Sequence, residues 1–413
     1  MNIPTMLKNL HERALAYHKE GKPGKLDVTS HKKLDNDQDL SLAYSPGVAA
    51  PVREIMNDAS KVNQYTIKGN LVAVITDGSA VLGLGNAGPL AAKPVMEGKA
   101  VLFKHFAGIN AFNIELDTQD VDEIVKTIKN IAPTFGGINL EDISAPRCFE
   151  IEQRLIQELD IPVFHDDQHG TAIIIAAGLL NALEIQDKSI DSAKIVVAGG
   201  GSAGIATLDL LVNLGFKKEN MILVDRRGVV SKEQISIVNK YKAEFAVDTD
   251  KKTLEDALDG ADVFIGVAQG NLVTQKMVKS MAKKPIIFAL SNPDPEISVE
   301  DVFACRDDAL MATGRSDFPN QVNNVIGFPY IFRGALDANS KIINTKMKIA
   351  AVHAIKDIAK LPVPKSLLDI YEIDELSFGK DYFIPKPFDH RLIELIPKAI
   401  FDAAVKSGVS RLK

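Results

Sequence analysis

Two pairs of adjacent acids are the groups in this sequence best suited to chemistry. NLEDIS supplies Glu141 and Asp142, and FHDDQHGT supplies Asp166 and Asp167. Each pair follows an apolar strand-like run or a turn, so we expect both to converge at strand ends, where open α/β sheets bind ligands. Neighbouring carboxylates repel one another unless they are protonated or metal-bound, and their hard oxygens suit Mg²⁺ or Mn²⁺. The pairs predict a divalent-cation site, with helix caps or solvated loop acids as the structural alternative.

Two histidines, His165 and His169, flank the second acidic pair at a spacing of four. On a helix this spacing can bind zinc. Gly170 and Thr171 indicate that the next helix begins after both histidines, so the sequence does not favour a zinc site.

A tyrosine and a lysine are candidates for moving protons. Tyr44 in LAYSPGVAAP stands beside a turn, and Lys99 in MEGKAVLFK is expected just before a strand. A lysine in an apolar cleft or near a cation loses affinity for its proton and can act as a general base, while a tyrosine hydroxyl can act as a general acid. Taken singly, each is as readily a surface lysine or a packed tyrosine. Asn292 in LSNPDP and Asn324 in NQVNN add neutral amides suited to holding a carboxylate.

The spacing G-x-G-x-x-G occurs twice, in VLGLGNAG (81–88) and in AGGGSAG (198–204). The second copy follows the strand-like IVVA and opens an apolar helix, and Asp225 ends the next strand, where an acid can bond a ribose 2′-hydroxyl. We therefore predict that the second copy binds a dinucleotide. At the first copy, Pro89 and Pro94 interrupt the expected helix, which favours a structural turn beside the active site. The predicted dinucleotide-binding residues of the second copy are Gly199, Gly201, Ser202, Ala203 and Gly204.

The coenzyme choice stays open at this stage. Asp225 favours NAD because it repels a 2′-phosphate, whereas Arg226 and Arg227 could receive that phosphate.

The surrounding pattern predicts an α/β fold of two domains. Short apolar runs (71–76, 100–103, 111–116 and from 161) alternate with helical stretches, and from about residue 192 a βαβ unit begins a Rossmann-like, doubly wound domain. We place a substrate and metal domain at 1–160, the dinucleotide domain at 161–344, and a helical segment at 345–413 that packs back on the first domain. The first 26 residues predict an amphipathic helix.

Composition restricts the class of protein. The 413 residues carry a net charge of -6, which gives no reason to expect nucleic acid as a partner. The longest apolar run, 172–180, is about half of the roughly 20 residues that a membrane span needs. With only two cysteines and no pattern typical of a signal peptide, we expect a cytoplasmic protein with no membrane partner.

Eight motifs in this order resemble those of the malic enzymes, particularly the short bacterial type, from about Ala43 onward. They are YSPGVAAP, ITDGSAVLGLGNAG, PVMEGKAVLFK, GGINLEDI, VFHDDQHGTA, AGGGSAG, LSNPDPE and TGRSDFPNQVNN. The resemblance implies oxidative decarboxylation of (S)-malate to pyruvate and CO₂ with NAD or NADP and Mg²⁺ or Mn²⁺, in a homodimer or higher homo-oligomer.

The resemblance also implies roles for individual residues. Glu141, Asp142 and Asp167 would be metal ligands, and Asp166 would orient the site. Lys99 would be the general base, and Tyr44 would protonate the enolpyruvate. The carboxylate of the substrate would be held by Asn292 and Asn324, of which Asn292 would also lie at the coenzyme. Larger malic enzymes carry an arginine where this chain has Ala80, so that contact is lost or supplied elsewhere.

Two other classes of protein fit part of the pattern. An amino-acid dehydrogenase also combines a substrate domain, a dinucleotide domain and a catalytic lysine, but it would leave the four acids unexplained. A non-catalytic dinucleotide-binding sensor would not need Tyr44, Lys99 and the acids together.

Overall fold

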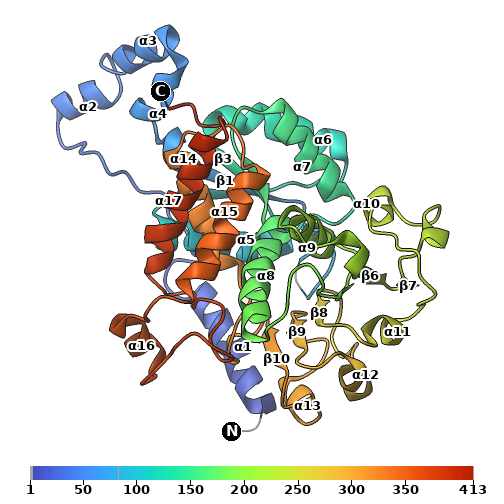
Figure 1. Cartoon of the computed structure of the whole chain (residues 1–413). Coiled ribbons are helices and arrows are strands. Elements are labelled where there is room, and N and C mark those ends of the chain that lie inside the picture. Colours follow the sequence, from blue (N-terminus) through green and yellow to red (C-terminus); the bar gives the residue numbers. More distant parts are fainter. Residues whose placement is uncertain (1–2, 82, 413) are drawn as a thin grey trace.

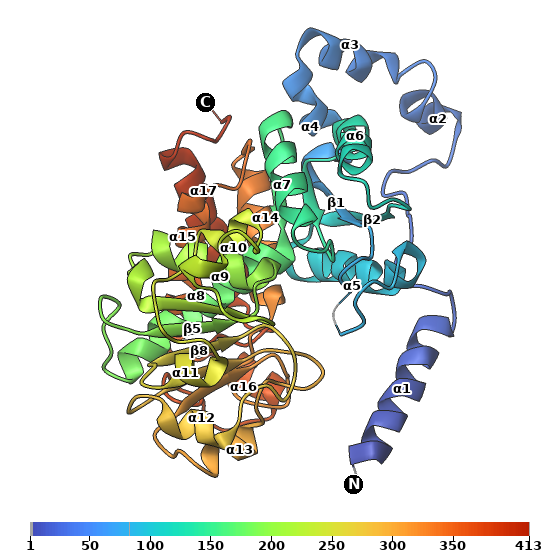
Figure 2. The same cartoon turned by 90° about the vertical axis from the view of Figure 1, so that its right-hand side faces the viewer.

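The protein is built on two parallel β-sheets with helices packed around them, as the computed structural model in Figures 1 and 2 shows for residues 3–81 and 83–412. The first sheet has the strand order β2-β1-β3-β4, and the second has the order β10-β9-β8-β5-β6-β7 with only β7 antiparallel. The α/β fold of two domains is therefore confirmed. The strands are β1 (Leu71–Thr76), β2 (Asn110–Glu115), β3 (Gly137–Leu140), β4 (Val163–His165), β5 (Ile195–Ala198), β6 (Met221–Asp225), β7 (Gly228–Val229), β8 (Val263–Gly266), β9 (Ile286–Ala289) and β10 (Leu310–Thr313).

Strands β1, β5 and β8 are apolar runs buried on both faces, as expected of parallel sheets covered by helices, whereas the edge strand β2 is only partly buried. The helices are α1 (Ile3–Lys19), α2 (Asp37–Ala43), α3 (Ala49–Asn57), α4 (Val62–Tyr65), α5 (Pro89–Ala107), α6 (Val121–Ile131), α7 (Arg147–Glu158), α8 (Asp166–Ile185), α9 (Ser202–Asn213), α10 (Lys240–Ala243), α11 (Leu254–Leu258), α12 (Gln275–Ser280), α13 (Val299–Phe303), α14 (Phe328–Asp337), α15 (Thr345–Ile358), α16 (Lys365–Tyr371) and α17 (Arg391–Lys406). None of the helices in the described ranges is long and apolar enough to cross a membrane.

The strand predicted over residues 100–103 is wrong, because this stretch lies inside the long helix α5. A run of four apolar residues does not distinguish a strand from a buried helix. Pro89 is the first residue of α5, where a proline costs no hydrogen bond, and the helix continues through Pro94. Lys99 therefore stands on a helix and not before a strand, on the face that also buries Met96 and Phe103.

The start of α8 also differs from the prediction. The helix begins at Asp166, directly after β4, so that the second acidic pair and His169 lie in its first turns. Carboxylates are favourable there because they face the positive end of the helix dipole. Gly170 lies within α8 and not at its start. The residue is a glycine because a Cβ there would lie 1.9 Å from Asp166 Oδ1.

Helices near the N-terminus, α2 and α3 above all, stand away from the two sheets. The predicted helix over residues 1–26 is α1, and Met1 and Asn2 lie outside the described residues. Helices α2, α3 and α4 bury none of their residues, and Figures 1 and 2 show α2 and α3 protruding from the body. Leu42, Tyr44 and Met56 are 70%, 71% and 80% exposed. This segment presents apolar side chains that nothing in the described chain covers.

The C-terminal helices pack on both parts of the molecule. Helix α17 lies against α14 and α15, while α15 packs on α8. In the irregular segment before α17, Phe388 contacts Phe106 of α5 at a ring distance of 5.5 Å. The first sheet includes β4, beyond the boundary that we placed at residue 160.

Candidate active site

A cleft of about 940 Å³ lies between the two sheets, at the carboxyl ends of their strands. From the first sheet it is lined by residues that follow β1, β3 and β4, and from the second by residues that follow β5, β8, β9 and β10. The strand order of the second sheet reverses between β5 and β8, so the cleft lies at the switch point where doubly wound sheets bind ligands.

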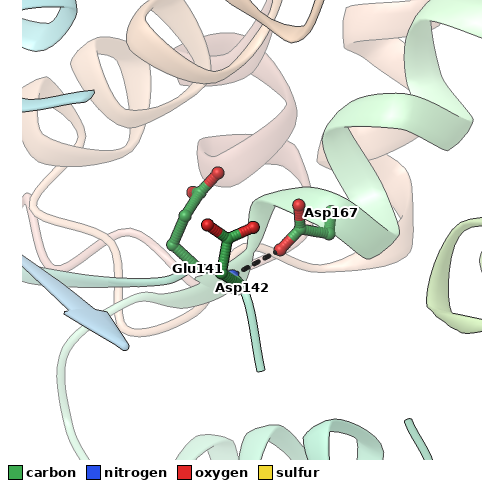
Figure 3. A group of neighbouring side chains, drawn as sticks. All are labelled: Glu141, Asp142 and Asp167. Carbon is green, nitrogen blue, oxygen red and sulfur yellow. Dashed lines mark hydrogen bonds between the residues drawn. The ribbon is translucent and has the colours of Figure 1, made fainter. Parts of the chain in front are cut away.

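Three carboxylates meet at the floor of this cleft (Figure 3). Glu141 and Asp142 follow β3, and Asp167 comes from the first turn of α8. Each offers an oxygen, and the three oxygens lie within 4.8 Å of one another. The Asp142 amide donates to Asp167 Oδ2 at 2.8 Å, which fixes the two residues against each other. The structure thus brings together the three acids that we expected to hold a metal.

Lys99 reaches the same acids from α5. Its ammonium lies 2.8 Å from Glu141 Oε1 and 2.6 Å from Asp166 Oδ2, and 4.1 Å from the ring centre of Phe328. Lys99 and Asp166 are both buried. A lysine between two carboxylates on one wall of a ligand cleft is placed to exchange a proton with a bound molecule.

The charges of this cluster perturb one another strongly. Burial, with the neighbouring Asp167 adding to it, raises the pKa of Asp142 to about 8. Burial also raises the pKa of Glu141 well above its usual value, although Lys99 opposes the shift. Burial by itself would lower the pKa of Lys99, but Asp166 and Glu141 more than offset it and raise that pKa. The raised pKa values show that full ionisation of these acids is costly with one ammonium present, and a bound cation would offset that cost.

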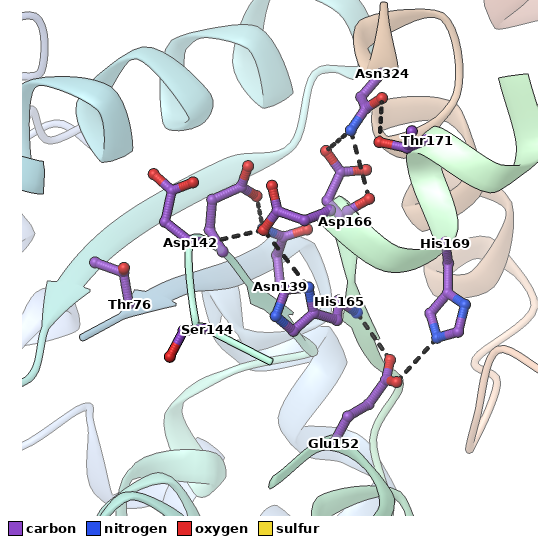
Figure 4. Close-up of polar contacts among 12 residues, drawn as sticks. Thr76, Asn139, Asp142, Ser144, Glu152, His165, Asp166, His169, Thr171 and Asn324 are labelled. Carbon is purple, nitrogen blue, oxygen red and sulfur yellow. Dashed lines mark hydrogen bonds and ion pairs between the residues drawn. The ribbon is translucent and has the colours of Figure 1, made fainter. Parts of the chain in front are cut away.

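Glu152 of α7 lies behind the acids and contacts both histidines (Figure 4). Its carboxylate accepts the His165 backbone N–H at 2.9 Å and contacts His169 Nε2 at 2.9 Å. The His165 ring is fully buried, 3.6 Å from Asp167 Oδ2. The two histidine rings contact different acids, His165 facing Asp167 and His169 facing Glu152.

The two predicted amides lie on the cleft wall. Asn324 donates to Asp166 Oδ2 at 3.1 Å and accepts from the Thr171 hydroxyl at 3.1 Å, so its orientation is set by both neighbours. Asn292 follows β9 and lines the cleft on the dinucleotide side. Gly83 of the first glycine motif packs against the Asn292 carbonyl, and a Cβ on Gly83 would lie 3.4 Å from it. Leu82 of that motif lies outside the described residues, and the rest forms a turn that leads into α5.

The second glycine motif joins β5 to α9 in the form that a pyrophosphate site needs. Gly199 has φ +122°, and a Cβ on Gly204 would meet the Gly199 carbonyl at 1.8 Å. Gly201 precedes α9, and no side chain caps that helix end. Ser202 and Ala203 line the cleft. The free N–H groups of a helix N-terminus at the cleft are suited to phosphate oxygens.

The acid at the end of β6 is already paired with a cation that the sequence analysis did not single out. Lys242 of α10 lies 2.7 Å from Asp225 Oδ2. A Cβ on Gly200 would be 3.1 Å from Lys242 Nζ, so the ammonium also stands at the glycine turn. Arg227 donates through its backbone to Asp225 and through its side chain to the Ile237 carbonyl, and Arg226 is exposed. No motif marks Lys242, because the loop that returns it to β6 is set by tertiary packing.

Of the predicted catalytic residues, Lys99 lines the cleft and Asp166 is buried against it, whereas Tyr44 lies elsewhere in the described chain. It follows α2, is 71% exposed, and does not line the cleft. Two residues of the N-terminal segment that the sequence analysis passed over, Tyr17 and Lys25, do line it.

The fold and the cleft together define a dinucleotide-dependent oxidoreductase. The malic enzyme N-terminal domain family matches residues 23–156, and the malic enzyme NAD binding domain family matches residues 168–379. The chain therefore belongs to the malic enzymes. As a member of that family it is an NAD(P)-dependent oxidoreductase, and the amino-acid dehydrogenase and sensor alternatives are set aside.

Relatives of this chain differ in length. It is 56% identical to the NADP-dependent malic enzyme of Halomonas elongata, over 97% of this chain and 94% of that protein. It is 54% identical to the NADP-dependent malic enzyme of Rhizobium meliloti, over 97% of this chain but only 53% of that longer protein. The crystal structure of malic enzyme from Pyrococcus horikoshii is similar with a TM-score of 0.90 and 42% identity, covering 98% of this chain and 92% of that one.

Proposed function

We propose that this cleft carries out the oxidative decarboxylation of (S)-malate to pyruvate and CO₂ with NADP as the preferred coenzyme. The observation that carries the proposal is the cluster of three carboxylate oxygens beside Lys99, facing the glycine turn across one cleft. We also propose a division into a substrate and metal domain that extends past residue 160 to include β4, a dinucleotide domain that follows it up to residue 344, and a C-terminal segment at 345–413, with the cleft between the first two.

Glu141, Asp142 and Asp167 are the proposed ligands of Mg²⁺ or Mn²⁺. Their oxygens are hard donors within 4.8 Å of one another, and Asp142 Oδ2 is buried with no hydrogen-bond partner among the described residues. The donor set therefore fits the ion. When bound there, a divalent cation supplies Lewis-acid polarisation of the substrate oxygen at C2.

Lys99 is the proposed general base for the C2 hydroxyl proton as hydride leaves for the nicotinamide. Its Nζ faces the acids from α5, and Asp166 holds it at 2.6 Å. Without a cation, Glu141 and Asp166 keep the ammonium protonated. A metal bound to Glu141 would weaken the attraction of that carboxylate for the Lys99 ammonium. The pKa of Lys99 would then fall, so that Lys99 can release and take up a proton.

Asn292 and Asn324 are proposed to hold a carboxylate of the substrate. Both line the cleft, and the Asn324 amide is oriented by Asp166 and Thr171. The NH₂ group of a neutral amide can donate hydrogen bonds to a carboxylate without adding charge to an already charged site. Asn292 lies on the side of the glycine turn and is proposed to contact the coenzyme as well.

The proposed coenzyme site comprises the second glycine turn and the residues after β6. Lys242 supports NADP over NAD, because it neutralises Asp225 at 2.7 Å and offers an ammonium beside the turn. Arg226 is exposed next to it and is proposed to reach the same 2′-phosphate. The residues proposed to bind the dinucleotide are Gly199, Gly201, Ser202, Ala203, Gly204, Asp225, Arg226 and Asn292.

Tyr44 is proposed to protonate C3 of enolpyruvate in the cleft of a second copy of the chain. Two features support this: Tyr44 is 71% exposed away from its own cleft, and apolar side chains around it are uncovered. The protein is thus proposed to work as a homodimer or a higher homo-oligomer. If so, mixing inactive Tyr44→Phe and Lys99→Ala subunits should restore about a quarter of the wild-type activity, because a hybrid dimer has one intact site. No recovery in verified hybrids would contradict the exchange.

The proposed reaction is tested by following nicotinamide reduction with malate, with NAD and NADP in parallel and with and without Mn²⁺. Pyruvate is measured as the product. Reduction that depends on Mn²⁺ and yields pyruvate supports the proposal. A folded protein that binds NADPH but yields no pyruvate with either coenzyme would contradict it.

A further inference from the structure

The cleft poses an electrostatic problem for an anionic substrate. Lys99 pairs with Glu141 and Asp166, and the carboxylates of Asp142 and Asp167 lie beside Glu141, so four acids share one ammonium. Even a bound divalent cation leaves this part of the cleft with a net negative charge. Malate brings two more carboxylates, and only the end nearest the acids can use the metal. The other carboxylate needs a separate cation or strong donors.

The wall formed by the turn after β1 does not supply that cation. Ala80 lines the cleft there with a methyl group. Arg147, which lies behind the turn, is occupied by Asp77, Ser79 and Ser144 at 3.0 to 3.1 Å. Within the described ranges, the cations that line the cleft are Lys99, which is already paired, and Lys25.

Lys25 is fixed on the cleft wall by contacts to α5. Its backbone N–H donates to Glu97 Oε2 at 3.0 Å, and its Nζ donates to the Pro94 carbonyl at 2.6 Å. Gly98 leaves room for this ammonium, since a Cβ there would lie 3.7 Å from Nζ. An ammonium has three N–H donors, so two remain for a ligand. Lys25 and Lys99 both line this cleft, Lys99 from α5 and Lys25 from the segment that contacts α5.

The surroundings of Lys25 leave its charge without a carboxylate partner at ion-pair distance within the described residues; its Nζ bonds a neutral carbonyl. Burial lowers the pKa of Lys25, although Glu97 opposes the shift. An anion beside the ammonium would offset the cost of its burial.

We propose that Lys25 binds the carboxylate of malate that lies away from the metal, and so selects a dicarboxylic 2-hydroxy acid. This inference rests on the proposed function. Lys25 is then a substrate-binding residue, because its ammonium would touch the substrate directly. The N-terminal segment that carries Lys25 becomes part of the active site. Asn292 and Asn324, which line the same cleft, would then complete the binding of the substrate.

The test compares Lys25→Met, which keeps the length of the side chain without its charge, with Lys25→Arg, which keeps the charge. Losing one charge-assisted bond should raise the KM for malate by about 10- to 100-fold, while kcat stays within about threefold. Lys25→Arg should recover most of that loss. Lys22→Met is the matched control, since Lys22 lies on the same segment with its side chain 86% exposed.

Oxalate, a competitive inhibitor expected to bind at the metal alone, separates Lys25 from the metal site. Its inhibition constant should be unchanged in Lys25→Met. An unchanged KM for malate, or a parallel rise for malate and oxalate, would overturn the assignment. Calorimetric binding of malate to the Mn²⁺-loaded protein gives the same comparison without turnover. Failure of the proposed function would therefore appear as wild-type protein without pyruvate formation, whereas failure for Lys25 would appear as equal malate affinity in wild type and variant.

Discussion

Removing the ammonium of Lys242 should weaken NADP binding far more than NAD binding. In the substitution Lys242→Met, Asp225 loses the partner that now lies 2.7 Å away. The two side chains are 20% and 6% exposed, so the pair is only partly screened by water. A charge-assisted bond to a phosphate contributes about 1.5 to 3 kcal/mol, which corresponds to roughly 10- to 100-fold in affinity.

The effect on NAD should be small or opposite in sign. The Asp225 carboxylate, released from Lys242, becomes free to accept a bond from the ribose 2′-hydroxyl of NAD and repels the 2′-phosphate of NADP. The ratio of kcat/KM for NADP over NAD should therefore fall by at least about tenfold, and most of the change should lie in the KM for coenzyme.

The assay is initial-rate kinetics with saturating malate and Mn²⁺, together with direct titration of NADPH and NADH. Lys240→Met on the same short helix is the matched control, because Lys240 is exposed and contacts the Tyr241 ring. Equal losses for both coenzymes would show that Lys242 only supports the local fold. An unchanged ratio would refute the reasoning and place the 2′-phosphate elsewhere, with Arg226 as the next residue to test.

Three further predictions concern the acids and Lys99. Lys99→Met should lower malate oxidation by about 10²- to 10⁴-fold with NADPH affinity unchanged, and a fully active, folded variant would contradict its role as base. Asp167→Asn should raise the Mn²⁺ concentration required for half-maximal activity by at least about tenfold, whereas an unchanged requirement would exclude Asp167 as a ligand. Because the folded pKa of Asp142 is raised to about 8, the ion-free protein binds more protons than the unfolded chain and should lose stability as pH rises toward 8. Thermal unfolding at pH 6 and pH 8, with and without Mn²⁺, checks this. Because Mn²⁺ binds the ionised acids, it should raise Tm more at about pH 8 than at pH 6. An equal rise in Tm at the two pH values would count against the raised pKa of Asp142.

Much of the fold followed from local pattern. The runs at β1, β5, β6, β8 and β9 are apolar and end at glycine, asparagine or acidic residues, which is the signature of buried parallel strands. The strand, glycine turn and helix of the second motif are adjacent in sequence, so the dinucleotide turn could be predicted without tertiary information.

The secondary-structure predictions were wrong where one local sequence pattern fits both a strand and a helix, or both a helix boundary and a helix interior. AVLF reads equally as a strand or as one face of a helix, and only the continuous buried face of α5 decides between them. Strand β10 and helices α2 to α4 were not predicted, because β10 is a run of four residues and the helices bury nothing in the described chain. The start of α8 was placed too late because glycine suggested a helix boundary where it is in fact demanded by packing against Asp166.

By itself, the sequence determined the chemical types at the site: paired acids, a lysine, two amides and a glycine turn, together with the enzyme family to which they belong. Those signals are local, because each motif is a short stretch that carries its own turn or strand end. Only the tertiary structure decided that Lys99 lies between Glu141 and Asp166, that Lys242 neutralises Asp225, and that Tyr44 stands outside its own cleft. These relations join residues far apart in the chain, and they arise from how sheets and helices pack, which no spacing in the sequence encodes.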